Sequence, residues 1–125
     1  MVANISNPSF SGGLNIAIKV PLHQYEETVA FYRDTLGLPL VEEEQEGCIF
    51  QYGPMRLWID KAPHLSKSDV WLELETTDTE AAARYLKNHG VVRRDEIEPL
   101  PDDFDGFFIT DPSGTVHLVV GDPSY

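Results

Sequence analysis

The sequence predicts an α+β domain in which one strand–helix–strands unit occurs twice. Segments 14–37 and 71–90 each begin with a short apolar strand, continue into an amphipathic helix and end at a glycine. A strand-rich tail follows each segment, over 48–59 and 107–120, with an aromatic strand, a tight turn and a final apolar strand. Such a repeat indicates one domain made of two modules, and two curved sheets can enclose a cavity between them.

The first module opens with a strand over Leu14–Val20, in which large aliphatic residues alternate with smaller or polar ones. Because successive side chains point to opposite faces of a strand, Asn15, Ala17 and Lys19 share the face opposite the aliphatic one. Turn residues then divide the rest of the module into three more expected strands, at about 39–43, 48–52 and 56–60.

A helix is expected between the strand that ends at Val20 and the strand at 39–43. It extends from about Gln24 to Leu36, with Gly37 just beyond its end. Its inward stripe follows the spacing i, i+4, i+7 and i+11, and consists of Tyr25, Val29, Tyr32 and Leu36. This spacing is typical of a helix that packs one face against a sheet.

The second module opens with a strand over Trp71–Thr76. We expect Leu72 and Leu74 to pack under a helix, which leaves Glu73 and Glu75 together on the other face. Two carboxylates at i and i+2 point the same way and could form a general base.

A predicted capping box of Thr77 and Glu80 begins the second helix, because these residues are three positions apart. The helix is expected to end at Gly90, and a strand is expected to begin at Val91–Val92. The final hairpin is expected to turn at Asp111–Gly114, whose sequence suits a type I turn.

The domain organisation follows from these elements. Residues 1–13 contain Asn, Ser, Pro and Gly and are expected to form a loose N-terminal arm. Residues 14–125 form a single domain, with module one at 14–60, a linker at 61–69 and module two at 70–122.

The charge of the chain limits its partners. It contains 9 basic and 21 acidic residues, a net charge of −12. This acidic balance excludes nucleic acid and anionic membrane surfaces as expected partners, and fits a neutral or cationic ligand. No signal sequence or membrane-spanning run is recognisable, so a cytoplasmic location is expected. Cys48 is the sole cysteine and lies in an apolar stretch, which favours a buried structural residue over a nucleophile.

Two motifs resemble a known family. Phe31–Leu38 resembles the FY…LG helix of the vicinal oxygen chelate superfamily, and Asp111–Gly114 resembles its closing DPxG turn. That superfamily includes glyoxalase I, bleomycin-resistance proteins, fosfomycin-resistance enzymes and extradiol dioxygenases. The resemblance covers about residues 14–122. It implies two βαβββ modules that form a curved mixed sheet around a ligand cavity, usually in a homodimer.

The resemblance also implies four metal-ligand positions, on the first and last strand of each module. In this sequence they correspond to Asn15, Asp60, Trp71 and Leu118. One carboxylate and one amide are too few for a tight transition-metal site. We therefore expect no metal and no other cofactor, and we assign no catalytic residue.

The expected cavity wall combines indoles, carboxylates and apolar surface. We predict these ligand-binding residues: Asn15, Ala17, Trp58, Asp60, Trp71, Glu73, Glu75 and Leu118. Indole faces beside carboxylates suit an aromatic or cationic organic ligand.

Three functions remain open from the sequence. The first, which we favour, is a metal-free protein that binds a small aromatic or cationic molecule, as the resemblance to the bleomycin-resistance branch implies. The second is a metal-dependent lyase or dioxygenase of the glyoxalase type with an atypical site formed by Asp60, Glu73 and His117. The third is a dimeric assembly or regulatory module. Whether the chain is an enzyme is therefore open, although the replaced ligands favour a binding protein.

Overall fold

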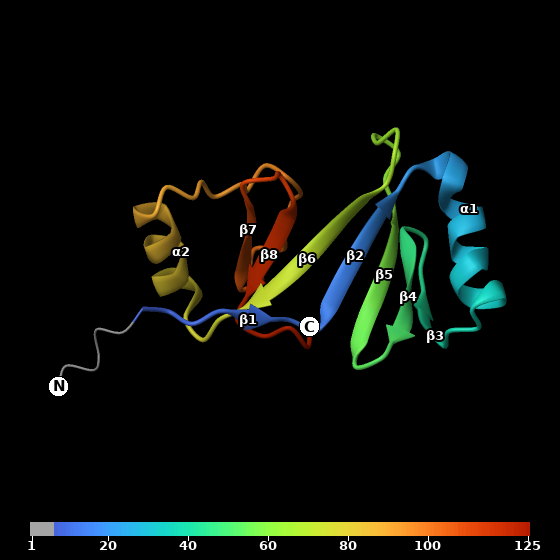
Figure 1. Ribbon diagram of the computed structural model, residues 1–125, viewed down its shortest axis with the longest axis horizontal. Coiled ribbons are helices and arrows are strands. Elements are labelled where there is room, and N and C mark those ends of the chain that lie inside the picture. Colours follow the sequence, from blue (N-terminus) through green and yellow to red (C-terminus); the bar gives the residue numbers. More distant parts are fainter. Residues whose placement is uncertain (1–6) are drawn as a thin grey trace. The chain divides into compact units, whose positions relative to one another are not determined.

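The structure is a computed structural model that describes residues 7–125. The chain forms two compact units, one of residues Leu14–Leu72 and one that joins the segment ending at Gly13 to Glu73–Tyr125. Each unit places one helix against strands (Figure 1). The predicted α+β class, with a mixed sheet and two modules, is confirmed.

The unit of residues 14–72 has the predicted strand–helix–three-strand order. Its elements are β2 (Asn15–Val20), α1 (Leu22–Ala30), the π-helical turn η2 (Phe31–Thr35), β3 (Leu40–Glu43), β4 (Gly47–Tyr52), β5 (Met55–Lys61) and the start of β6 (Asp69–Glu75). The strand order is β3-β4-β5-β2-β6. β2 runs parallel to β5, while β3–β4, β4–β5 and β2–β6 are antiparallel.

The core of this unit lies between α1 and one face of its strands. Its buried members are Val20, Tyr25, Val29, Cys48, Phe50, Leu57 and Ile59. Ile16 and Ile18 of β2 pack against this cluster. The predicted alternation of β2 therefore holds, and Asn15, Ala17 and Lys19 lie on the face away from α1.

The end of the first helix differs from the prediction. The helix begins at Leu22, and residues 31–35 form a π-turn in which the Leu36 N–H donates to the Phe31 carbonyl at 2.9 Å. A π-turn holds one more residue than an α-turn and rotates the side chains that follow. Leu36 is consequently 51% exposed, and Leu38 packs against the core instead. Gly37 has the expected positive φ of 69°.

The other unit lacks one of its predicted strands. It contains β1 (Ser11–Gly12), the end of β6, α2 (Thr79–Asn88), β7 (Gly106–Thr110) and β8 (Val116–Val120). The strand order is β6-β8-β7, and β1 pairs with β6. The strand expected at Val91–Val92 is reduced to an isolated bridge between Arg93 and Ile109.

The core of this second unit lies under α2. Buried Ala82, Phe107, Ile109 and Val119 form it, and Leu74 packs against them as predicted. Leu72, which was expected to pack in the same way, is 37% exposed, so that prediction is wrong. Leu72 belongs to the other unit, because the division between the units falls after it.

Two local features of this unit correct the sequence analysis. The α2 N-cap is Asp78 and not Thr77, since the Asp78 carboxylate accepts the Ala81 N–H at 3.0 Å; Asp is a better cap than Thr. Part of the expected loose arm is paired, because Ser11 and Gly12 lie opposite Glu75 and Leu74. Residues 1–6 of that arm lie outside the described residues.

The closing hairpin forms as predicted. The Gly114 N–H donates to the Asp111 carbonyl at 2.9 Å, and Gly114 has a φ of 92°, which suits glycine. The Asp111 carboxylate accepts the Ser113 hydroxyl and the N–H groups of Ser113 and Thr115. These hydrogen bonds lower the pKa of Asp111 below its usual value. Among residues 7–125, neither helix is long and apolar enough to cross a membrane.

Candidate functional site

Two rows of side chains cross the β5-β2-β6 strands on the face away from α1. Ala17 of β2 lies opposite Trp58 of β5 and Trp71 of β6, which gives a Trp–Ala–Trp row. The adjacent row has Lys19 opposite Asp60 of β5 and Asp69 of β6. We call these two rows the Trp face. Its residues all belong to the 14–72 unit.

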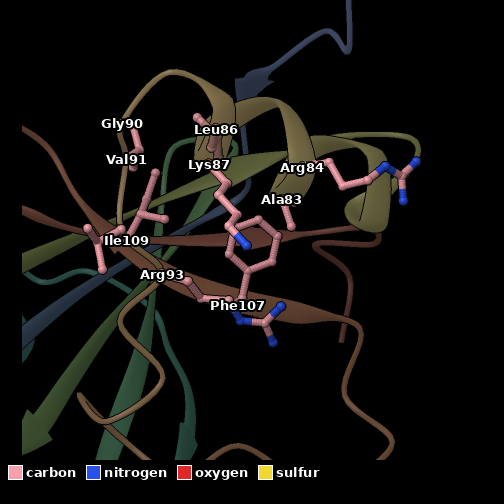
Figure 2. A pocket seen from close by; sticks show the side chains of 10 residues that line it. Ala83, Arg84, Leu86, Lys87, Gly90, Val91, Arg93, Phe107 and Ile109 are labelled. Carbon is pink, nitrogen blue, oxygen red and sulfur yellow. The ribbon is translucent and has the colours of Figure 1, made fainter.

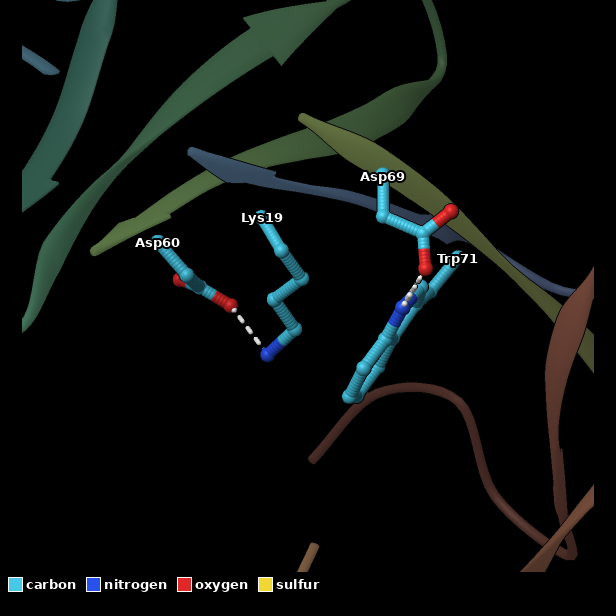
Figure 3. Close-up of polar contacts among 4 residues, drawn as sticks. All are labelled: Lys19, Asp60, Asp69 and Trp71. Carbon is cyan, nitrogen blue, oxygen red and sulfur yellow. Dashed lines mark hydrogen bonds and ion pairs between the residues drawn. The ribbon is translucent and has the colours of Figure 1, made fainter. Parts of the chain in front are cut away.

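Lys19 is the central charged group of the Trp face. Its Nζ lies 2.9 Å from Asp60 Oδ2 and 4.1 Å from the centre of the Trp71 ring. Figure 3 shows the Lys19 side chain extending to Asp60, with the Trp71 indole beside it. The residue is only 8% exposed, and an ammonium group at that depth needs a counter-charge. The ion pair with Asp60 and the ring of Trp71 provide it.

Both indole N–H groups of the Trp face have polar partners. Trp58 Nε1 donates to Asn15 Oδ1 at 2.7 Å, and Trp71 Nε1 donates to Asp69 Oδ2 at 3.1 Å (Figure 3). Asn15 and Lys19 lie on opposite sides of Ala17 along β2. The two indoles therefore lean toward opposite ends of the strand, with the Ala17 methyl group between them.

These contacts do not fit the metal that the family resemblance implies. The Asn15 side-chain oxygen is a hydrogen-bond acceptor for an indole, Asp60 pairs with an ammonium group, and Trp71 has no metal-ligating atom. A divalent cation at Asp60 would be repelled by Lys19. Within residues 7–125, no group of three or more His, Cys, Asp or Glu side chains is arranged to hold a metal ion.

Three of the predicted binding residues lie in the other unit. Glu73 is buried and its carboxylate accepts the Tyr125 hydroxyl, while Glu75 Oε1 accepts the Ser11 hydroxyl at 3.5 Å. Leu118 lies opposite Phe108 in the closing hairpin and is half-buried. The Trp face thus contains four of the eight predicted residues, Ala17, Trp58, Asp60 and Trp71, and Asn15 adjoins it through its hydrogen bond with Trp58. Glu73, Glu75 and Leu118 belong to the other unit.

The atypical metal site proposed from the sequence does not assemble on one face. His117 lies opposite Ile109, on the side where Ile109 and Val119 form the core under α2, and its Nδ1 is 3.1 Å from the Thr115 carbonyl oxygen. Glu73 alternates with Leu74, which packs into that same core. Glu73 and His117 therefore point to opposite faces of their sheet.

Cys48 is a structural residue, as the sequence suggests. It is 2% exposed and belongs to the core under α1. Burial raises the pKa of its thiol, which disfavours the nucleophilic thiolate.

Sequence reasoning underestimated two residues of the Trp face. Lys19 is not among the predicted binding residues, and Asp69 falls in the predicted linker at 61–69. Asp69 could have been found, because it stands two residues before Trp71 and shares its face. The pairing of Lys19 with Asp60 depends on the β2–β5 register, which one sequence does not specify.

Comparisons with known proteins agree with this architecture. Residues 16–120 match the family described as the glyoxalase-like domain. None of the curated proteins matches this chain.

Several solved structures share the fold at low sequence identity. One is the Mn(II)-bound glyoxalase from Novosphingobium aromaticivorans, with 18% identity, a TM-score of 0.68, and coverage of 93% of this chain and 40% of that one. Another is methylmalonyl-CoA epimerase from Mycobacterium tuberculosis, with 17% identity, a TM-score of 0.65, and coverage of 94% and 92%. A variant of homoprotocatechuate 2,3-dioxygenase from B. fuscum has 18% identity, a TM-score of 0.67, and coverage of 99% and 35%. At these identities the likeness shows the fold alone.

We predict that Lys19 and Asp60 stabilise the chain as a pair. Lys19→Met leaves the partly buried Asp60 carboxylate without a cationic partner. Asp60→Asn leaves the Lys19 ammonium without a counter-charge. Each should lower the free energy of unfolding by about 1–3 kcal/mol in urea titrations. The double variant should lose less stability than the sum of the losses in the two single variants. Strict additivity would contradict the pairing. Arg33→Gln, which breaks an exposed pair with Asp34, is the control and should have little effect.

Proposed function

We propose that this chain, which belongs to the glyoxalase-like domain family of the vicinal oxygen chelate superfamily, binds a small aromatic molecule on its Trp face without a tightly held transition metal. The observation that carries the proposal is the Trp58–Ala17–Trp71 row. It places two indoles on either side of a methyl group, on the sheet face that α1 does not cover.

The spacing of the row suits a planar ligand. Neighbouring strands are about 4.8 Å apart, so the backbones that carry the two indoles are separated by roughly 10 Å across β2. Ala17 is the smallest side chain in the row and adds little bulk between them. An aromatic ring above Ala17 could contact both indoles, and offset or edge contacts between aromatic rings are favourable.

The polar groups of the Trp face favour an aromatic ligand over a cationic one. The ammonium group of Lys19 already lies over the Trp71 ring and neutralises Asp60. A cationic ligand would have to displace Lys19 from both partners, at the cost of leaving an ammonium group poorly compensated. A ligand with an aromatic body and one polar substituent could instead hydrogen-bond at the Lys19–Asp60 pair.

We infer a binding role and not a catalytic one from the same groups. A catalytic Asp60 would need to be available as a base or metal ligand, whereas it accepts a hydrogen bond from Lys19. Sequestration of a small molecule requires only shape and a few orienting polar groups. The glyoxalase and the dioxygenase among the similar structures are more than twice as long as this chain, so their activities are not transferred to it.

Ligand binding should be visible through the two indoles. In a library of neutral, anionic and cationic aromatic compounds, we expect neutral members to quench tryptophan fluorescence and raise the melting temperature. Trp71→Leu should weaken the binding of such a hit by about two- to tenfold, the loss expected for one aromatic contact. Tyr52→Leu removes an exposed ring from the opposite face of β4 and should leave the affinity unchanged. A library without hits, or one whose hits are all cations, would contradict the proposal.

Divalent metals should leave the protein unchanged. A folded site saturated at 100 times its Kd would stabilise the chain by about 2.7 kcal/mol, a large shift in melting temperature. With chelator-treated protein, we expect no such shift from Mn²⁺, Fe²⁺, Ni²⁺ or Zn²⁺. Stabilisation by one of them that Asp60→Asn removes would favour the enzyme alternative instead.

We also propose a homodimer that forms through β3. This strand is at the edge of its sheet and all four of its residues are exposed, including Val41 at 53%. Unpaired backbone groups beside apolar side chains favour addition of a strand from a second copy.

Sedimentation at several protein concentrations tests this interface. The unchanged protein should sediment as a dimer, and Val41→Glu should shift it toward the monomer. Leu22→Glu places the same charge at another apolar residue, 55% exposed at the start of α1, and should leave the dimer intact. A protein that is monomeric at every concentration would contradict the proposed dimer.

A further inference from the structure

An apolar cavity of about 530 Å³ lies in the second unit, between α2, the segment that follows it and β7 (Figure 2). Its apolar lining consists of Ala83, Leu86, Val91, Val92, Phe107 and Ile109. This volume is within the range of pockets that bind small molecules. The cavity is on the α2 side of its sheet and shares no residue with the Trp face.

The cavity exists because a strand is missing. In the 14–72 unit, β3 pairs with β4 over several residues. In the second unit, the corresponding segment makes only the single bridge from Arg93 to Ile109. The Val92 side chain is left 71% exposed. Within the described residues, β7 pairs with β8 along one edge and has no full strand along its other edge.

Cationic side chains surround this apolar surface. Three of the nine basic residues of the chain line the cavity: Arg84, Lys87 and Arg93. In Figure 2 the Lys87 side chain extends from α2 toward the side of the cavity where Arg93 and Phe107 lie, whereas the Arg84 guanidinium points away. The Arg93 guanidinium lies 5.1 Å from the centre of the Phe107 ring and also pairs with Asp95. A local excess of cations is unusual in a chain with a net charge of −12.

We propose that this cavity binds an amphipathic organic acid. The apolar body of the ligand, aromatic or branched aliphatic, packs against Phe107, Leu86 and Val91. Its carboxylate lies at the rim, where Lys87 and the remaining donors of Arg93 can bind it. The acidic remainder of the protein repels anions in general, so two convergent cations beside an apolar wall select this class of ligand over neutral and cationic molecules.

A matched pair of probes tests the proposal. 2-Naphthoate and 2-naphthamide have the same ring system, but only the first carries a charge. In titrations followed by amide NMR, naphthoate should shift signals from 83–93 and 106–109. Naphthamide should bind at the same place about two- to fivefold more weakly, the difference expected for a partly exposed charge pair. The advantage of naphthoate should shrink at high salt.

Substitutions distinguish the contribution of the charge to binding from that of the apolar wall. Lys87→Gln should weaken naphthoate binding by about two- to fivefold and leave naphthamide binding unchanged. Arg84→Gln removes the same charge from a side chain that points away from the cavity, and should change the affinity for neither probe. Ala83→Leu, a substitution that suits a helix, fills part of the cavity and should weaken both probes.

Several outcomes would overturn the inference. They are equal affinity for the two probes, an equal effect of Lys87→Gln and Arg84→Gln, and no shifts at millimolar naphthoate. Shifts confined to the indoles and amides of the Trp face would also overturn it, while supporting the function proposed above. Because the two sites share no residue, either one can fail without the other.

Discussion

The parallel register of β2 and β5 is the constraint on which the first unit depends. It places Ile16 and Ile18 beside Leu57 and Ile59, and α1 covers this aliphatic face. A shift of one residue would turn the aliphatic set toward the other face and expose it, so the core fixes the register. The same register then sets Ala17 opposite Trp58 on the uncovered face. The chemistry of the Trp face is thus a consequence of core packing on its reverse side.

The Lys19–Asp60 pair follows from this register and limits what the face can do. Lys19 is too deeply placed to remain without a counter-charge, and Asp60 is the carboxylate that the register brings opposite it. A carboxylate required for this structural purpose is a poor metal ligand, because coordination would force two cations together. The Lys19 ammonium provides the positive charge beside Asp60.

The sequence predicts the elements whose signals are local. The alternation of β2, the positive φ at Gly37 and the Asp111–Gly114 turn all follow from short patterns, and the structure confirms them. The outward rotation of Leu36 could not be predicted, because a π-turn has no distinct hydrophobic period. The residues of the Trp face could be assigned to one side of each strand. Their partners across strands could not, because register is decided by packing on the opposite face.

The missing strand of the second unit has a physical cause in its own segment. After Arg93 the chain turns, with the Ile97 N–H donating to the Arg94 carbonyl at 3.1 Å. Two prolines follow at positions 99 and 101, and neither can donate to a strand ladder. The segment therefore leaves β7 after one bridge. Apolar side chains that a further strand would have covered line a cavity instead. The two units therefore have unequal surfaces. The 14–72 unit has an additional edge strand, and the other unit has a recess whose cationic rim differs from the rest of the acidic chain.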